Sequence, residues 1–148
     1  MSSGKPVPSP DTTIMVRDTC LCLHVQRAAR VLARRFDDAF RPLGLTSGQF
    51  SLLMSLNRPE PPSIGDVAEV LAMDRTTLTA ALKPLKRRKL VTIAVDKNDR
   101  RSRRLALTTD GRSLLAAAVP VWKKTHAELD TLLPRGGDAL RRDLMALR

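Results

Sequence analysis

Two short amphipathic segments lie almost end to end in the chain, between residues 63 and 87. Ser63 and Asp74 are residue types that cap helix N-termini, and apolar residues recur at steps of three and four after each of them. Only Ala72 and Met73 separate the first apolar stripe from the second cap. Two helices joined this tightly cannot lie side by side as a long hairpin, so the spacing predicts a helix-turn-helix.

A β-hairpin is expected directly after these helices. Val91, Ile93 and Val95 alternate with smaller or polar residues, as in a half-buried strand. The stretch RLAL, residues 104–107, returns with Leu105 and Leu107 on one side. The sequence therefore predicts a mainly α fold with a small β-hairpin, arranged as a winged helix-turn-helix over about residues 46–108.

Positive charge is concentrated in the second predicted helix and the hairpin. The formal net charge is +11, and residues 83–104 hold ten lysines and arginines against two aspartates. A local basic patch of this size indicates a polyanionic partner, nucleic acid first and an anionic membrane second, with a merely solvated charged face as the alternative. No apolar run approaches the ~20 residues that span a bilayer, and the N-terminus does not resemble a signal peptide. We therefore expect a cytoplasmic protein with no membrane partner.

Long helices flank the predicted winged domain. Residues 1–15 are rich in Ser and Pro and are expected to form a flexible arm, followed by helices over about residues 16–42 and 109–148. Thr46, with Gln49 three residues later, and Thr108 are the expected caps. The apolar faces of the flanking helices exceed what one winged domain needs for its core, so we expect a homodimer; a larger monomeric core is the alternative.

The hairpin carries the most specific motif of the chain. In DRRSRRLALTTDG, residues 99–111, Asp99, Arg101, Leu107, Thr108 and Gly111 stand at D-x-R and L-T-x-x-G positions. With the helix-turn-helix before it, this stretch resembles the multiple antibiotic resistance regulator (MarR) family over about Leu21–Leu133. The resemblance implies a homodimeric DNA-binding transcription factor on a palindromic operator, commonly a repressor that a small molecule or oxidation releases.

Several positions depart from the pattern of that family, among them Thr92 and Ile93, which replace its commoner Glu-Arg pair. Lys89 stands where the family has glycine, which would leave the end of the second helix without its usual left-handed cap. Pro84 lies inside the same helix and removes one backbone donor. Because the apolar stripe stays in phase across Pro84, we expect a bend and not a break.

Candidate DNA contacts follow from the chemistry of these side chains. Arg75 can bond guanine with two hydrogen bonds, and threonine can offer its methyl group to thymine or its hydroxyl to phosphate. The cap of the first helix supplies Ser63, the second helix supplies Arg75, Thr76, Thr77, Thr79, Lys83 and Arg87, and the hairpin supplies Lys97, Asp99, Arg100, Arg101 and Arg103. The alternative for the threonines is an ordinary place in a first helical turn, and for Lys86 and Arg88 a solvated helix end.

The arginine-rich tip fits a narrow minor groove, where negative potential is concentrated. Asp99 lies two residues before Arg101 and, by the family resemblance, would hold that arginine in position. The alternative is an aspartate that bonds its own turn backbone.

The resemblance also implies control by an effector of the aromatic or phenolic type, bound between the flanking helices and the winged domain. His24, Arg27, Arg30 and Trp122 are candidate ligand residues, although each is more often a packing or surface residue. Cys22, in the stretch CLCL, stands where peroxide-sensing relatives carry a reactive cysteine, so a thiol-based peroxide sensor is the alternative function. The chain has no tyrosine to support such a thiol.

Other function classes find less support. Two histidines and two cysteines show no metal-site spacing, and no nucleophile motif is present, so we expect neither an enzyme nor a bound cofactor. A non-specific nucleic-acid-binding basic protein is a remoter alternative. Aromatic residues, on which RNA readers stack bases, make up only 3% of the chain and are missing from the basic stretch.

Overall fold

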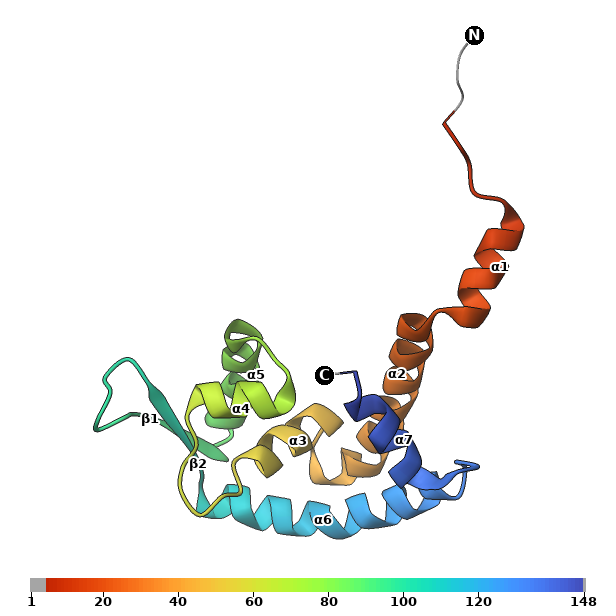
Figure 1. Cartoon of the computed structure of the whole chain (residues 1–148). Coiled ribbons are helices and arrows are strands. Elements are labelled where there is room, and N and C mark those ends of the chain that lie inside the picture. Colours follow the sequence, from red (N-terminus) through yellow and green to blue (C-terminus); the bar gives the residue numbers. More distant parts are fainter. Residues whose placement is uncertain (1–4, 148) are drawn as a thin grey trace.

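The computed structural model describes residues 5–147, which fold into a mainly helical chain with one hairpin (Figure 1). The elements are α1 (Pro10–Thr19), α2 (Leu21–Phe40), the 3-10 helix η1 (Arg41–Leu43), α3 (Ser47–Ser55), α4 (Ile64–Leu71), α5 (Arg75–Arg87), β1 (Val91–Val95), β2 (Arg103–Leu107), α6 (Thr109–Asp130) and α7 (Gly136–Met145). This order confirms the predicted winged helix-turn-helix between flanking helices.

Side-chain caps begin the helices at the predicted residues. Thr46 and Gln49 form a capping box at α3, and Ser63 forms a second one with Asp66 at α4. Asp74 accepts the Thr77 N–H at the start of α5, and Thr108 accepts the Gly111 N–H at the start of α6. Each cap satisfies backbone donors that the first helical turn leaves free, which is why short-range sequence fixes these boundaries.

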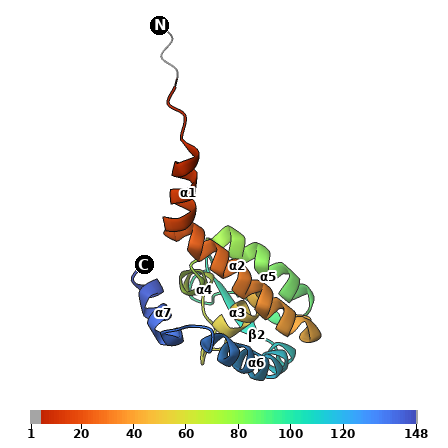
Figure 2. The same ribbon diagram turned by 90° about the vertical axis from the view of Figure 1, so that its right-hand side faces the viewer.

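The N-terminal prediction was wrong in one respect. Residues 1–15 were expected to form an arm before a helix starting near Val16, but α1 already begins at Pro10, with Ser9 as its cap. Proline at the first helical position after a serine cap is a strong start signal, and it outweighs the polar composition here. Cys20, with extended backbone, then separates α1 from α2. None of the residues of α1 is buried, and the helix projects away from the rest of the chain (Figure 2).

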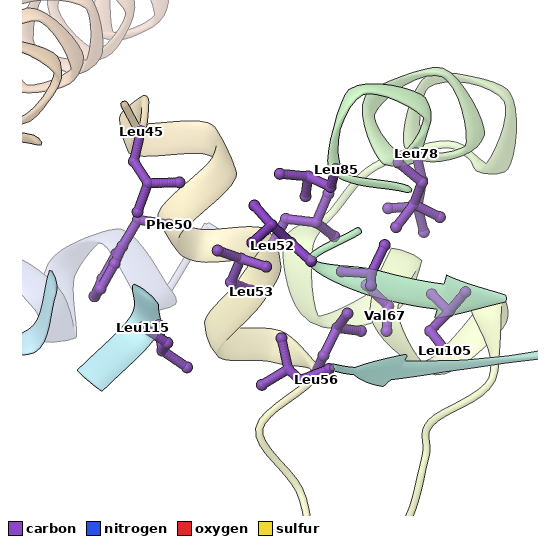
Figure 3. Close-up of a cluster of buried hydrophobic side chains, with 14 of the residues drawn as sticks. Leu45, Phe50, Leu52, Leu53, Leu56, Val67, Leu78, Leu85, Leu105 and Leu115 are labelled. Atoms are coloured by element: carbon purple, nitrogen blue, oxygen red, sulfur yellow. The ribbon is translucent and has the colours of Figure 1, made fainter. Parts of the chain in front are cut away.

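The hydrophobic core lies where α3 meets α4, α5, the hairpin and α6 (Figure 3). Its fully buried large side chains are Phe40, Leu53, Val67, Leu78, Leu82, Leu85 and Leu105. The α5 leucines recur at helical spacing and therefore turn one face of that helix inward, leaving the other to solvent. The core thus fixes which side of α5 is exposed.

The hairpin pairs Val91 with Leu107 and Val95 with Arg103 in antiparallel register. β2 also uses its outer edge, because the Leu105 N–H donates to the Pro62 carbonyl at 2.9 Å and Ser63 forms a bridge with Arg104. The wing is therefore attached to the segment that enters α4. Towards the tip the hairpin leaves the body of the protein, and Val95 is half exposed.

The end of α5 shows how two of the departures from the family pattern are accommodated. The helix runs on through Pro84 to Arg87, as predicted. Lys89 does adopt the left-handed conformation, with φ of 58°, so the expected loss of that cap was wrong. The Leu90 N–H reaches back to the Leu85 carbonyl at 3.0 Å, as a left-handed helix end allows. The hydrogen bonds therefore hold a non-glycine residue in a conformation that L-residues avoid.

The L-T-x-x-G motif joins α6 to the end of α5. The Thr108 hydroxyl donates to the Lys89 carbonyl at 2.7 Å, and the Thr108 N–H donates to the Leu90 carbonyl at 3.0 Å. A Cβ atom on Gly111 would lie 2.1 Å from that same Leu90 oxygen. Glycine is required at this position because two backbones meet there.

Gly111→Ala should therefore destabilise the protein by about 3 kcal/mol, since either α6 or the Leu90 carbonyl must move. Gly48→Ala is the matched control, because its Cβ would meet only the Thr46 hydroxyl at 4.0 Å. Urea unfolding followed by circular dichroism measures both. Equal midpoints for the two variants would contradict the close approach.

Candidate nucleic-acid interface

The exposed face of α5 gathers four of the predicted contact residues. Arg75, Thr76, Thr79 and Lys83, together with Ala80, line a shallow cavity of about 340 Å³. They lie together because positions three and four apart share a helix face, opposite the buried leucines. A concave strip of guanidinium, hydroxyl, methyl and ammonium groups suits the edges of base pairs in a major groove.

Arg75 packs against the neighbouring helix of the pair. A Cβ atom on Gly65 would lie 3.1 Å from Arg75 Nη2, so the guanidinium rests over the first turn of α4. The missing side chain of Gly65 leaves the room that Arg75 occupies. Arg75 is nevertheless an exposed residue.

Three predicted contact residues of the two helices have structural partners: Ser63, Thr77 and Thr79. The Thr79 hydroxyl donates to the Arg75 carbonyl at 2.8 Å. The Thr77 hydroxyl donates to Asp74 Oδ2 at 2.7 Å, and the Thr77 N–H donates to Oδ1 at 2.8 Å. At α4, the Ser63 N–H donates to Asp66 Oδ2 at 3.0 Å, while Ser63 Oγ accepts the Asp66 N–H at 3.1 Å. Ser63 and Thr77 therefore serve the starts of their helices, a role that the sequence analysis had allowed for Thr77.

The basic end of α5 divides into free and bound side chains. Lys86 and Arg87 are exposed in the last turn, and Arg87 lies one turn beyond Lys83. Arg88 instead donates from Nη1 to the Gly44 carbonyl at 2.7 Å. Arg88 thereby ties the end of α5 to the C-terminus of η1.

The tip of the wing exposes Lys97, Arg100, Arg101 and Arg103. Asp99 Oδ1 accepts the Arg101 N–H at 3.0 Å, which is the turn role that the sequence left open. Within residues 5–147 no ion pair joins the Asp99 and Arg101 side chains. The Arg101 guanidinium therefore extends from a turn that Asp99 shapes through the backbone.

Sequence reasoning missed the ion pair at the base of the tip. Arg104 Nε lies 2.5 Å from Oδ2 of Asp96, whose residue is only 7% exposed. The Asn98 N–H and the Arg104 side chain hold the pKa of the Asp96 carboxyl below its usual range. Asp96 and Arg104 lie on one face of the hairpin, so the register would have indicated this pair.

A second, larger cavity lies among α2, α6 and α7, with a volume of about 670 Å³. Of the four candidate effector residues, His24 and Arg27 line this cavity, whereas Arg30 and Trp122 do not. Trp122 instead stacks on Phe50 at 6.5 Å between ring centroids and lies tilted against His126 at 4.9 Å. His126, Arg35 and Arg141 also line the cavity and were missed, because only the tertiary arrangement brings them to its apolar walls.

The two cysteines flank the start of α2. Cys20 is its cap, and Cys20 Sγ accepts the Leu23 N–H at 3.5 Å. Cys22 is exposed in the first turn, where Gln26 Nε2 donates to its Sγ at 3.3 Å. Cys22 is therefore not the small buried side chain that the sequence analysis considered as an alternative.

Large apolar side chains remain exposed on the flanking helices. The faces of α2 and α7 show Leu21, Val25, Val31, Leu32, Leu140, Leu144 and Met145, all at least 39% accessible. Of the residues of α2 only Phe40 is buried. Seven large exposed side chains on two helices are more than the single scattered apolar residues that are normal on a protein surface.

Neither membrane-spanning helices nor metal-binding groups are found among the described residues. No helix between residues 5 and 147 combines the length and the apolar character needed to cross a bilayer. In the same range no three histidine, cysteine, aspartate or glutamate side chains lie close enough to share an ion.

Comparisons with known proteins agree with this geometry. The sequence model of the MarR family matches residues 43–102. The M. tuberculosis transcriptional regulator MosR, solved in complex with DNA, is 36% identical with a TM-score of 0.80, and the match covers 86% of this chain and 92% of MosR. The Bordetella bronchiseptica regulator BpsR, whose DNA binding 6-hydroxynicotinic acid regulates, is 28% identical with a TM-score of 0.77, over 87% of this chain and 93% of BpsR.

The curated relatives match over a shorter length. The transcriptional activatory protein BadR of Rhodopseudomonas palustris is 33% identical over 95 residues, which is 62% of this chain and 54% of BadR. The chain spans about half the length of the first curated relatives it matches.

The cap of α5 generates a pH prediction. The Thr77 N–H, and then the Thr77 hydroxyl, lower the pKa of the Asp74 carboxyl. A carboxyl whose pKa is lower in the folded state stabilises the fold above its unfolded pKa of about 3.9, and this contribution disappears as pH falls through the folded pKa. Asp74→Asn keeps a good cap without a titrating group. Between pH 7 and pH 3, the urea midpoint of unfolding should fall less for Asp74→Asn than for wild type. Identical pH profiles of the two proteins would contradict this role of Asp74.

Proposed function

Because the chain belongs to the MarR family of transcriptional regulators, we propose that it is a dimeric, sequence-specific DNA-binding repressor that acts in the cytoplasm and is released by a small aromatic effector. The observation that carries the proposal is the pairing of an exposed, polar α5 face with an arginine-rich wing. Both lie at the same end of the molecule, away from α2 and α7 (Figure 1).

In this proposal α5 enters the major groove. Arg75 and Thr76 lie at its N-terminal end, where a recognition helix contacts base edges. Lys83, Lys86 and Arg87 follow along the same helix and would meet phosphates. Base contacts then set the preferred sequence, and phosphate contacts supply affinity.

The wing would reach the adjacent minor groove. Its tip carries Arg100 and Arg101 on a two-stranded support, beyond the point where the hairpin leaves the core. A narrow minor groove attracts such arginines through its concentrated negative potential. Lys97 and Arg103 lie beside them and would contact the flanking phosphates.

A second copy of the chain is the proposed cover for the exposed apolar side chains of α2 and α7 that do not line the cavity, Leu21, Val25 and Met145. Two-fold symmetry brings the same patch of both chains together, so one self-complementary surface suffices. It also places two α5 helices for two DNA half-sites. An inverted-repeat operator follows from this arrangement.

The cavity among α2, α6 and α7 supports an aromatic acid as effector. Its walls are mostly apolar, while His24, Arg27 and Arg35 bring groups that attract a carboxylate. The likeness to BpsR, whose DNA binding 6-hydroxynicotinic acid regulates, favours the same class of molecule here. An effector bound against α6 lies on the helix that the Thr108 junction couples to α5.

Exposure of the Cys22 thiol supports the second candidate function, a peroxide-sensing regulator. Oxidation needs an accessible thiolate. Cys22 lies at the start of α2, close in the chain to the cavity residue His24. Oxidation of Cys22 would therefore act on the same helices as an effector bound in the cavity.

Selection of duplexes from a random-sequence pool tests the main proposal. Wild type should enrich an inverted repeat with half-site centres one helical turn apart, about 10 base pairs, or a multiple of it. Arg75→Ala should relax the preference at one position of each half-site and weaken binding by about 1–3 kcal/mol. Lys86→Ala should weaken all duplexes alike and flatten the salt dependence. No enriched sequence, or equal sequence-blind losses in both variants, would refute the assignment.

Release from the selected duplex separates the two kinds of control. We expect an aromatic acid to release wild type and Cys22→Ser equally, and Arg27→Ala to need about tenfold more of it, because one cation of the cavity is lost. Fluorescence anisotropy of the labelled duplex measures release. Release by an organic hydroperoxide alone, abolished in Cys22→Ser, would favour the peroxide sensor instead.

A further inference from the structure

We propose that Asp96 and Arg104 are positioning residues for DNA binding: they hold the wing at a fixed angle to α4 and α5, so that its tip and α5 reach adjacent grooves together. This inference rests on the proposed function and adds to it two residues that need not touch DNA. It also gives Arg104 a different role from the cations that are proposed to contact DNA.

The register of the hairpin brings the two side chains together. Beyond the last strand pair, Val95 and Arg103, the Asp96 N–H donates to the Ser102 carbonyl at 3.1 Å. Asp96 thus lies opposite Ser102, and Arg104 is its diagonal neighbour on the same face. The Asp96 carboxylate accepts hydrogen bonds from the Asn98 N–H at 2.8 Å and from Arg104 Nε at 2.5 Å. It therefore joins the turn at the tip to strand β2.

Arg104 extends this contact to the body of the protein. Its Nη1 donates to the Pro61 carbonyl at 3.3 Å, in the segment that leads into α4. The neighbouring Leu105 N–H donates to the Pro62 carbonyl at 2.9 Å. One guanidinium therefore connects the tip, β2 and the entry to the helix-turn-helix.

Burial of the Asp96 carboxylate makes it depend on Arg104 as its charged partner. The Asp96 side chain is 8% exposed and the Arg104 side chain 45%. A buried carboxylate needs charged and hydrogen-bonding partners, and removal of one partner leaves the other uncompensated. Arg104 has the planar fork that reaches carboxylate and carbonyl together, which a lysine ammonium lacks.

The sign of the charge separates positioning from simple electrostatics. Asp96 carries negative charge beside a surface proposed to bind phosphate, so it opposes binding if charge alone matters. Its neutralisation should then tighten binding. If Asp96 sets the angle of the wing, neutralisation should weaken binding even though the net charge rises.

The test uses full-length protein and the duplex that wild type selects from the random pool. Asp96→Asn and Arg104→Lys should each weaken binding about tenfold, with loss of hydroxyl-radical protection in the minor groove and retained methylation interference in the major groove. Asp110→Asn is the matched control, because it removes one exposed carboxylate from the first turn of α6, and it should bind at least as tightly as wild type. In an Arg101→Ala background, Asp96→Asn should weaken binding little further. The tip then lacks the arginine that enters the minor groove, so its position matters less.

Each contrary result is informative. Equal or tighter binding by Asp96→Asn would show that Asp96 acts through charge alone, and full affinity of Arg104→Lys would show that Arg104 is an ordinary phosphate contact. Additive losses with Arg101→Ala would also overturn the inference. Circular dichroism confirms that each variant is folded at the assay temperature. A wild-type chain that selects no duplex would refute the proposed function itself, and this role with it.

Discussion

The carbonyl group of Leu90 is the point on which the arrangement of helices depends. It accepts the Thr108 N–H, and Gly111 approaches it too closely for any side chain. The end of α5, the start of β1 and the start of α6 thus share one backbone junction. Thr108 directly precedes α6, so no flexible loop lies between α6 and this junction. The junction therefore connects α6, one of the flanking helices, directly to the end of the helix proposed to read DNA.

Much of the fold could be predicted because its signals are local. The caps Thr46, Ser63, Asp74 and Thr108 act on backbone donors within three residues, so their sequence positions determine where helices begin. Alternation of apolar residues was likewise sufficient for the hairpin, although its paired length extends one residue further, to Arg103. Polar composition was the weaker guide at the N-terminus, where the Ser9 cap and Pro10 begin a helix.

The candidate site was harder to predict, because the same residue type can serve DNA or the protein itself. Sequence chemistry identified the exposed face with Arg75, Thr79 and Lys83, which helical spacing alone brings together. It could not reveal that the Thr77 hydroxyl donates a hydrogen bond to Asp74, or that Arg104 forms an ion pair with Asp96. Those partners depend on side-chain direction and strand register. The cavity among α2, α6 and α7 depends on how three distant segments pack.

The internal hydrogen bonds of Arg88, Arg103 and Arg104 also affect how strongly salt opposes the binding of a polyanion to this stretch. Of the ten cations between residues 83 and 104, these three donate to protein oxygens, which leaves at most seven with side chains free to displace condensed counterions. Each neutralised phosphate contributes about −0.9 to the slope of log K against log salt. Counterion release per protomer from this stretch is therefore smaller than the sequence charge suggests, and proportionally more of the binding free energy must come from shape and base contacts.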